Sequence, residues 1–298
     1  MYNVGDMMKT RRRRVIVSPF PMDLTLSHSE PVEIVLAYTR FWLAMAYTIM
    51  ATVVMFTLTL FGLLVPGDAG RRWQLFCART WAAGILRAAR CPVVVTRLST
   101  EPSPAGGFLY FSNHHSMLDI LALFVALRET PFVFAAKREL FKVPFIGWHL
   151  RLAGYVEVDR QNRDRAISSF ARAARQIRER GTVVTVYPEG TRSVDGTILP
   201  FKKGPFMLAL EAQVPIVPIA VDGAQLALRK HTLRLYGHPI RVVIGNSIET
   251  RGLAQADRDD LLRQTRLAIL DLHRMAGAGP SPIEPMIAPP GKRTGERE

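Results

Sequence analysis

The chain has 298 residues, of which 48% are apolar, enough for one large domain or two small ones with a sizeable core. Its two cysteines, Cys77 and Cys91, exclude a disulfide framework and favour a reduced, cytoplasmic setting. The formal net charge of +14 implies an anionic partner: nucleic acid, an anionic membrane surface or a phosphate-bearing substrate.

The N-terminal part of the chain combines a basic segment with a long apolar one. Residues 1–30 are polar and arginine-rich, with RRRR at 11–14, and are predicted to form a flexible basic arm. An uncharged run then extends from Phe41 to Val65. A helix of that length would measure roughly 37 Å, enough to cross a bilayer core of about 30 Å. No apolar signal-peptide core follows RRRR, so this N-terminus is not expected to be a signal peptide. The apolar run itself predicts that the chain is membrane-bound.

The charges that flank the apolar run leave two membrane arrangements open. Positive residues usually mark the cytoplasmic side of a span, but here Arg40 precedes the run and Arg71 and Arg72 follow it. The next segment, RRWQLFCARTWAAGILRAAR, mixes aromatic residues with arginines, as interfacial helices do. Residues 31–91 are therefore expected to be a helix pair embedded in the membrane from the cytoplasmic face, with a single crossing as the alternative.

From Pro92 onward, short β-branched runs alternate with helical stretches. This alternation predicts an α/β fold for residues 92–276, with a mostly parallel mixed sheet flanked by helices. Residues 277–298 are rich in Pro and Gly and are predicted to be a disordered tail. The predicted helices cover 116–129, 164–181 and 257–275, and the predicted strands cover 93–96, 107–111, 131–135, 155–158, 182–187, 216–221 and 241–244.

The segment NHHSMLD, residues 113–119, follows a predicted strand and carries candidate catalytic residues. His114 and Asp119 can meet if His114 lies in the turn after the strand and Asp119 in the first helical turn, with Ser116 as N-cap. A carboxylate that accepts from one ring nitrogen leaves the other basic, and such a base can deprotonate a hydroxyl that attacks a carbonyl. Alternatively, His114 and His115 satisfy loop backbone groups. A metal site is less favoured, because no further ligand cluster of usual spacing follows.

The segment YPEGTRS, residues 187–193, ends another predicted strand, where α/β proteins commonly bind ligands. Arg192 could bind a phosphate in bidentate fashion, and Gly190 would let backbone amides approach an anion. Glu189 could orient Arg192 or accept a hydrogen bond from a substrate hydroxyl. The alternative is an ordinary β-turn with a surface arginine.

Two more segments carry weaker signals. GYVEVDR, residues 154–160, ends in Asp159 and Arg160, which taken alone are most simply a surface ion pair. VPIVPIAV, residues 214–221, contains two prolines, which are unfavourable in a central strand. That run is expected to be an edge strand or the wall of an acyl pocket.

Together these segments resemble the glycerolipid acyltransferase family, whose best-known members are 1-acylglycerol-3-phosphate acyltransferases. The family motif NHxSxxD is matched by Asn113, His114, Ser116 and Asp119, and its other motifs follow in family order. AAKRELFKVPFIGW, residues 135–148, also looks like a family segment that lies between the first two motifs. Four motifs in order make the resemblance specific; they are matched within residues 113–119, 154–160, 188–193 and 214–218.

The resemblance implies a mechanism without cofactor or metal. Asp119 would orient His114, and His114 would take the proton of a glycerol hydroxyl while that oxygen attacks the thioester of acyl-CoA or acyl-carrier protein. His115 falls at a variable motif position and is expected to pack or contact solvent. Arg160 and Arg192 would bind the phosphate of the acceptor with help from Lys137, and Glu189 and Gly190 would shape the turn or position the glycerol. The implied substrate-binding residues are Lys137, Arg160, Glu189, Gly190, Thr191 and Arg192.

The implied activity is acyl transfer to the sn-2 hydroxyl of 1-acylglycerol-3-phosphate, giving phosphatidic acid, at the cytoplasmic face of a bacterial inner membrane. The expected partners are this lysophospholipid, the acyl thioester or its carrier protein, and membrane lipid. The first alternative is another acceptor, such as lyso-ornithine lipid or a different lysophospholipid. A non-catalytic anionic-lipid binder is disfavoured by the intact His114–Asp119 pair. Nucleic-acid binding rests on charge alone, because no recognised module is present.

Overall fold

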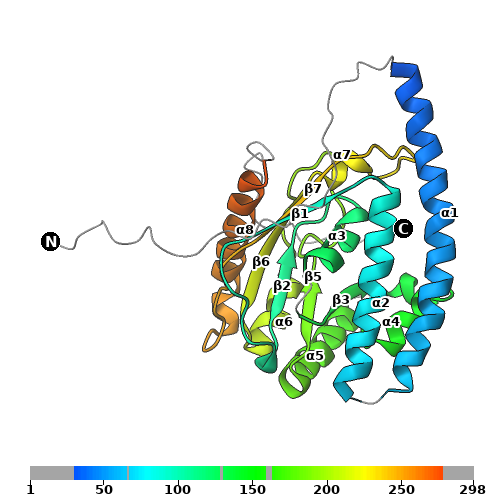
Figure 1. Ribbon diagram of the computed structural model, residues 1–298. Coiled ribbons are helices and arrows are strands. Elements are labelled where there is room, and N and C mark those ends of the chain that lie inside the picture. The colour runs from blue at the N-terminus through cyan, green and yellow to red at the C-terminus, as the bar shows by residue number, and fades with distance from the viewer. Residues whose placement is uncertain (1–29, 66, 128–129, 159–162, 278–298) are drawn as a thin grey trace, which may run out of the picture.

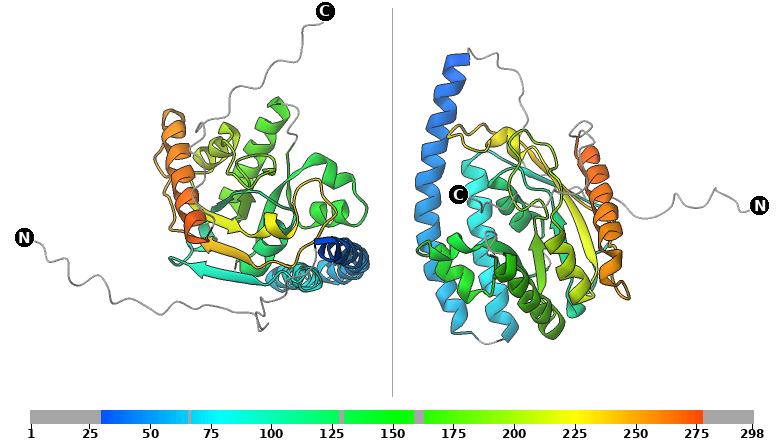
Figure 2. Two further views of the ribbon diagram at one scale, coloured as in Figure 1. Left: turned by 90° about the horizontal axis from the view of Figure 1, so that it is seen from above. Right: turned by 180° about the vertical axis from the view of Figure 1, so that it is seen from behind.

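The computed structural model describes residues 30–65, 67–127, 130–158 and 163–277. The predicted basic arm and all but the first residue of the predicted tail lie outside these residues. Two helices at one edge pack against an α/β domain whose sheet runs through its middle (Figures 1 and 2).

The first two helices, α1 (Glu30–Leu63) and α2 (Gly67–Ala88), form an antiparallel pair. The Trp81 indole N–H donates to Thr52 Oγ1 at 3.0 Å and links them. Gly84 permits their close approach, because a Cβ there would lie 2.2 Å from Tyr47 Oη. By length and composition, Pro31–Gly62 could cross a membrane: the mean hydropathy of its most apolar 18-residue window is 1.9, and only 17% of that window is buried. Exposed apolar side chains of α1 include Trp42, Leu43, Ile49, Met50, Val54 and Phe61.

The α/β domain is built on a seven-stranded sheet with the order β1-β7-β6-β2-β5-β3-β4. Neighbouring strands are parallel except β6 and β7, so the predicted mostly parallel mixed sheet is confirmed. Every predicted strand is present within two residues of its expected bounds. The strands are β1 (Val93–Arg97), β2 (Leu109–Ser112), β3 (Phe132–Lys137), β4 (Val156–Val158), β5 (Val183–Val186), β6 (Ile216–Asp222) and β7 (Ile240–Ile244).

Helices cover both faces of the sheet (Figure 2). On one face, α3 (Leu118–Ala126) lies between the sheet and α2; on the other lie α5, α6 and α8. The central strand β2 is buried on both sides: Tyr110 packs into the first layer and Phe111 into the second. The remaining helices are α4 (Ile146–Leu152), α5 (Arg163–Arg180), α6 (Lys203–Ala212), α7 (Ala224–Ala227), α8 (Arg258–Met275) and the 3-10 turns η2 (Pro104–Gly106), η3 (Arg138–Lys142) and η4 (Gln255–Asp257).

The expectation that VPIVPIAV is an edge strand is wrong. Strand β6 is an interior strand, buried along its whole length between β2 and β7. Pro218 faces β7 just past the last β6–β7 pair, Ile219 with Ile244. Its carbonyl still accepts a hydrogen bond from the Gly245 N–H there. Its missing N–H therefore falls at the end of that ladder, and pairing with β2 is unaffected.

Candidate active site

The polar segments singled out above meet at one edge of the sheet. Strands β2, β5 and β3 are neighbours, and their carboxyl ends lead into His114, into the turn Tyr187–Arg192 and to Lys137. The carboxyl ends of parallel strands are where open α/β sheets bind ligands. Asp159 and Arg160, which follow β4 next to β3, lie outside the described residues.

His114 and Asp119 form the hydrogen-bonded pair that the motif predicts. His114 Nδ1 lies 2.9 Å from Asp119 Oδ2, and the carboxylate is fully buried. Because the carboxylate oxygen can only accept, Nδ1 carries the proton and Nε2 is left as the basic nitrogen. The same oxygen also accepts the backbone N–H groups of His115 and Ser116, at 2.7 and 2.8 Å. The aspartate therefore fixes both the ring tautomer and the turn that carries the ring.

Two flanking residues hold this turn to the rest of the domain. The Asn113 side chain donates to the Val221 carbonyl and accepts from the Val221 N–H, both at 2.8 Å, which ties the end of β2 to β6. The Ser116 hydroxyl donates to the Leu228 carbonyl at 2.8 Å and lies 3.3 Å from the Leu118 N–H. Ser116 was expected to be the N-cap of the helix, but Met117 occupies that position. The main role of the Ser116 side chain is to anchor the turn to the loop after α7.

The turn after β5 encloses His114 from the other side. The Tyr187 ring stacks on the imidazole with centroids 4.0 Å apart and planes 15° apart. Glu189 Oε1 accepts the His114 N–H at 2.6 Å, and the Ser193 N–H donates to the His114 carbonyl at 3.0 Å. Gly190 adopts φ +71°, and a Cβ there would lie about 3 Å from the Lys202 side chain. A residue with a side chain would be strained at that position.

Glu189 lies behind the site wall. It is 2% exposed, and its second oxygen accepts the Leu199 N–H at 2.8 Å. Burial raises its pKa to about 8, although the two backbone donors oppose the shift. Of the two roles expected for Glu189, the geometry therefore favours shaping the turn over contact with the glycerol.

A cavity of about 630 Å³ opens beside His114, between the sheet edge and the helix pair. One end is cationic, with Lys137, Arg192 and Lys202 among the lining residues, and no carboxylate lines the cavity within the described residues. Lys137 also pairs with the exposed Glu139 at 3.3 Å. Gly190 and Thr191 line the same end. The apolar end is lined by Thr52, Met55, Phe56, Ala78, Trp81, Ile120, Phe124, Phe145, Ile146 and Leu150.

The structure adds site residues that sequence reasoning missed. Lys202 lies 14 residues beyond Pro188, yet its N–H donates to the Pro188 carbonyl at 2.9 Å, which brings its side chain over Gly190. Lys230 donates to the Arg192 carbonyl at 2.8 Å and supports the turn from the opposite side. Neither lysine belongs to a recognisable motif. For Lys202 the one available signal was a lysine pair, KK, directly before the apolar segment GPFMLAL, residues 204–210.

His115 points away from the cavity into a second polar cluster. It is buried against His273 of α8, with ring centroids 5.2 Å apart, and burial lowers the pKa of both imidazoles, that of His273 to about 4. Asp222 Oδ1 lies 3.8 Å from His273 Nε2. No group of three His, Cys, Asp or Glu side chains arranged to hold a metal occurs within the described ranges. His115 therefore packs in the interior, one of the two positions expected for it.

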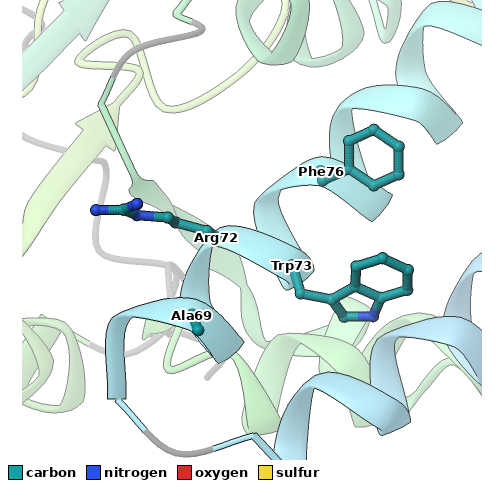
Figure 3. A pocket seen from close by; sticks show the side chains of 4 residues that line it. All are labelled: Ala69, Arg72, Trp73 and Phe76. Atoms are coloured by element: carbon teal, nitrogen blue, oxygen red, sulfur yellow. The ribbon is translucent and has the colours of Figure 1, made fainter.

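A second hollow lies on the outside of α2, lined by Ala69, Arg72, Trp73 and Phe76. Figure 3 shows the two aromatic rings on one side of the helix and the Arg72 side chain extending to the other. The Trp73 indole N–H donates to the Leu58 carbonyl at 2.7 Å, so the ring also joins α2 to α1. This hollow has no acid, base or nucleophile and is not a candidate active site.

Comparison with known proteins agrees with this geometry. The family model described as Acyltransferase matches residues 94–222. A 1-acyl-sn-glycerol-3-phosphate acyltransferase of Limnanthes alba is 44% identical over 135 residues, which are 45% of this chain and 47% of the relative. The human 1-acyl-sn-glycerol-3-phosphate acyltransferase alpha is 36% identical over 173 residues, 57% of this chain and 60% of the relative.

A solved structure shares the fold. The crystal structure of the 1-acyl-sn-glycerophosphate acyltransferase from Thermotoga maritima has a TM-score of 0.64 and 23% identity, and the match covers 83% of this chain and 96% of that one. The chain spans about half the length of the curated relatives it matches. The motifs, the family match and the fold agree, and residues 94–222 form a domain of the acyltransferase family.

Proposed function

We propose that the protein is a membrane-bound 1-acylglycerol-3-phosphate O-acyltransferase, which moves a fatty acyl group from a thioester to the sn-2 hydroxyl of lysophosphatidic acid. The observation that carries the proposal is the His114–Asp119 pair beside a cavity with one cationic and one apolar end. A lysophosphatidic acid has the same two parts, a phosphate monoester and an acyl chain. The relatives named above support this substrate class.

The reaction follows from the tautomer of His114. Nε2 takes the proton of the sn-2 hydroxyl while that oxygen bonds to the thioester carbonyl carbon. The tetrahedral intermediate then collapses, the C–S bond breaks, and the leaving thiolate takes the proton from the imidazolium. Asp119 holds the ring and stabilises its charged form throughout, so the base returns to its starting state.

The cationic end would receive the phosphate of the acceptor. Arg192 can form a paired contact with two phosphate oxygens, and Lys202 can add a point charge from the other side of Gly190. Lys137 contributes less, because Glu139 already neutralises part of its charge. Arg160 lies outside the described residues, and its contact with the phosphate stays a prediction from the motif.

The apolar end would hold acyl chain, and its walls come partly from the helix pair. Met55 and Phe56 of α1 and Trp81 of α2 line it. Because α1 also carries exposed apolar side chains, we propose that the pair lies in the membrane, with the α/β domain at the cytoplasmic face. A lipid substrate could then enter the cavity without passing through water. The donor is proposed to be acyl-CoA or acyl-carrier protein, without a cofactor.

The test is a comparison of acceptors. Detergent-purified protein is given a labelled acyl thioester with lysophosphatidic acid, lyso-ornithine lipid or lysophosphatidylcholine, and the His114→Ala variant serves as the blank. The proposal predicts product mainly from lysophosphatidic acid, because it alone offers a phosphate monoester to the cationic end. A higher kcat/KM for lyso-ornithine lipid or lysophosphatidylcholine would contradict the substrate assignment, and no transfer to any acceptor would contradict acyl transfer itself.

A further inference from the structure

Glu189 is a buried carboxylate whose two oxygens are both used by backbone donors. Oε1 accepts the N–H of His114 at 2.6 Å, and Oε2 accepts the N–H of Leu199 at 2.8 Å. A buried carboxylate is unfavourable unless it is paired or hydrogen-bonded, and here two amide donors supply that compensation. The Glu189 side chain does not line the cavity. Its position is explained by its hydrogen bonds to the backbone of His114 and Leu199 and not by contact with a ligand.

The whole of His114 is held by the segment that contains Glu189. The N–H bonds to Glu189, the carbonyl accepts from the Ser193 N–H, and the imidazole stacks on Tyr187. Asp119 adds the fourth contact, at Nδ1. No torsion of the His114 main chain can change by much without breaking one of these hydrogen bonds. One of the contacts that hold the His114 backbone thus comes from a residue 75 positions away in the sequence.

On the basis of the proposed acyl transfer, we infer that Glu189 is a positioning residue, which acts through the backbone N–H of His114 and does not touch the acceptor. Proton transfer needs the base within hydrogen-bond distance of the hydroxyl, and a misplacement of about 1 Å can lower a rate about 100-fold. The glutamate serves the reaction by keeping Nε2 at the cavity wall. It differs in this from Arg192, which faces the cavity.

Kinetics of two Glu189 variants separate positioning from substrate binding. Glu189→Gln keeps the length but places an amide NH₂ against one of the two N–H donors. Glu189→Asp keeps the carboxyl group but is one methylene too short to reach both donors. Both variants are expected to lower kcat about 10- to 100-fold. The Kd of lysophosphatidic acid, measured without acyl donor, should stay within about twofold. Glu249→Gln, which alters an exposed carboxylate, is the matched control and should leave both quantities unchanged.

Two kinetic outcomes would overturn the inference. A Kd for lysophosphatidic acid at least tenfold weaker, with kcat retained at saturation, would show that Glu189 contacts the acceptor. Wild-type kcat in Glu189→Asp would show that the reach of the carboxyl group to both N–H donors does not matter.

Hydrogen exchange on the wild-type protein tests the contact without any variant. The His114 amide should be strongly protected, whereas exchange at the rate of an unprotected amide would sink the inference even if the variants failed to fold. In folded Glu189→Gln, residues 113–116 should exchange at least tenfold faster, while strand β5 keeps its protection. A wild-type protein that transfers no acyl group to any acceptor would disprove the proposed function, and the exchange data would still decide the Glu189 contact.

Discussion

The two ends of the cavity are built in different ways. The cationic end, with His114 and Arg192, consists of turns at strand ends, where side-chain and backbone hydrogen bonds between distant segments fix each group. The apolar end consists mainly of apolar side chains from the helices that meet by packing, with one hydrogen bond between them, from Trp81 to Thr52. Chemistry needs exact placement of polar atoms, whereas an acyl chain needs only a shaped apolar volume. Substitutions at the two ends should therefore change different kinetic quantities.

Apart from removal of the imidazole itself, the largest effect is expected from Asp119→Asn at the polar end. An uncharged amide oxygen is a weaker acceptor for the three N–H groups that Oδ2 holds and no longer stabilises the imidazolium, so both the ring and its turn are held less firmly. The kcat should fall roughly 10²- to 10⁴-fold, the range for general-base catalysis. Steady-state kinetics checks this, with the exposed Asp271→Asn as control. A loss of less than tenfold would mean that the polar end does not depend on this hydrogen bond.

Lys202→Ala should mainly raise the KM for lysophosphatidic acid, by roughly tenfold, because a charge-assisted hydrogen bond contributes about 1.5–3 kcal/mol. Its neighbour offers a matched control: Lys203 pairs with Asp259 at 3.2 Å and does not line the cavity, so Lys203→Ala should leave KM unchanged. Arg192→Ala should act in the same direction as Lys202→Ala. An equal change of KM in Lys202→Ala and Lys203→Ala would contradict the assignment of the cationic end.

At the apolar end, Met55→Trp should shift the preference toward shorter acyl chains. It should not change how much Lys202→Ala raises the KM for lysophosphatidic acid. Each methylene that no longer fits loses about 0.8 kcal/mol of burial, a factor of about four in kcat/KM. Val54→Trp is the control, because Val54 is exposed on the outside of the same helix. A series of donors and lysophosphatidic acids of different chain length would measure the shift. The same preference in both variants would mean that α1 does not bound the cavity.

Behind the polar end, His273 links stability to pH. Burial lowers the pKa of its imidazole to about 4 from an ordinary value of 6.5, so the unfolded chain binds the proton more readily. The contribution of neutral His273 is complete above pH 6.5 and is lost as the pH falls from 6.5 to about 4. His273→Leu should flatten this part of the plot of Tm against pH, while kcat at pH 7 stays within about twofold. An unchanged slope would mean that His273 does not cause it.

The sequence predicted the parts of this protein that depend on local patterns. Apolar patterns predicted the strands and helices α3, α5 and α8, but not α4, α6 or α7. Because His114 and the turn at Gly190 both follow strands, their meeting at one sheet edge could be expected. The interior place of Pro218 could not be predicted, because it depends on where the pairing with β7 ends. The nearness of Lys202 to Gly190 and the contact of Glu189 with His114 depend on long-range packing that no single segment encodes.

The most direct test of the whole account compares wild-type protein and His114→Ala with labelled acyl thioester and lysophosphatidic acid. The account predicts labelled phosphatidic acid from the wild type and no product above background from His114→Ala, with the Kd for lysophosphatidic acid unchanged. Retention of the fold is checked by the Tm of the variant. Turnover of folded His114→Ala within tenfold of the wild-type rate would contradict the claim that this imidazole is the base.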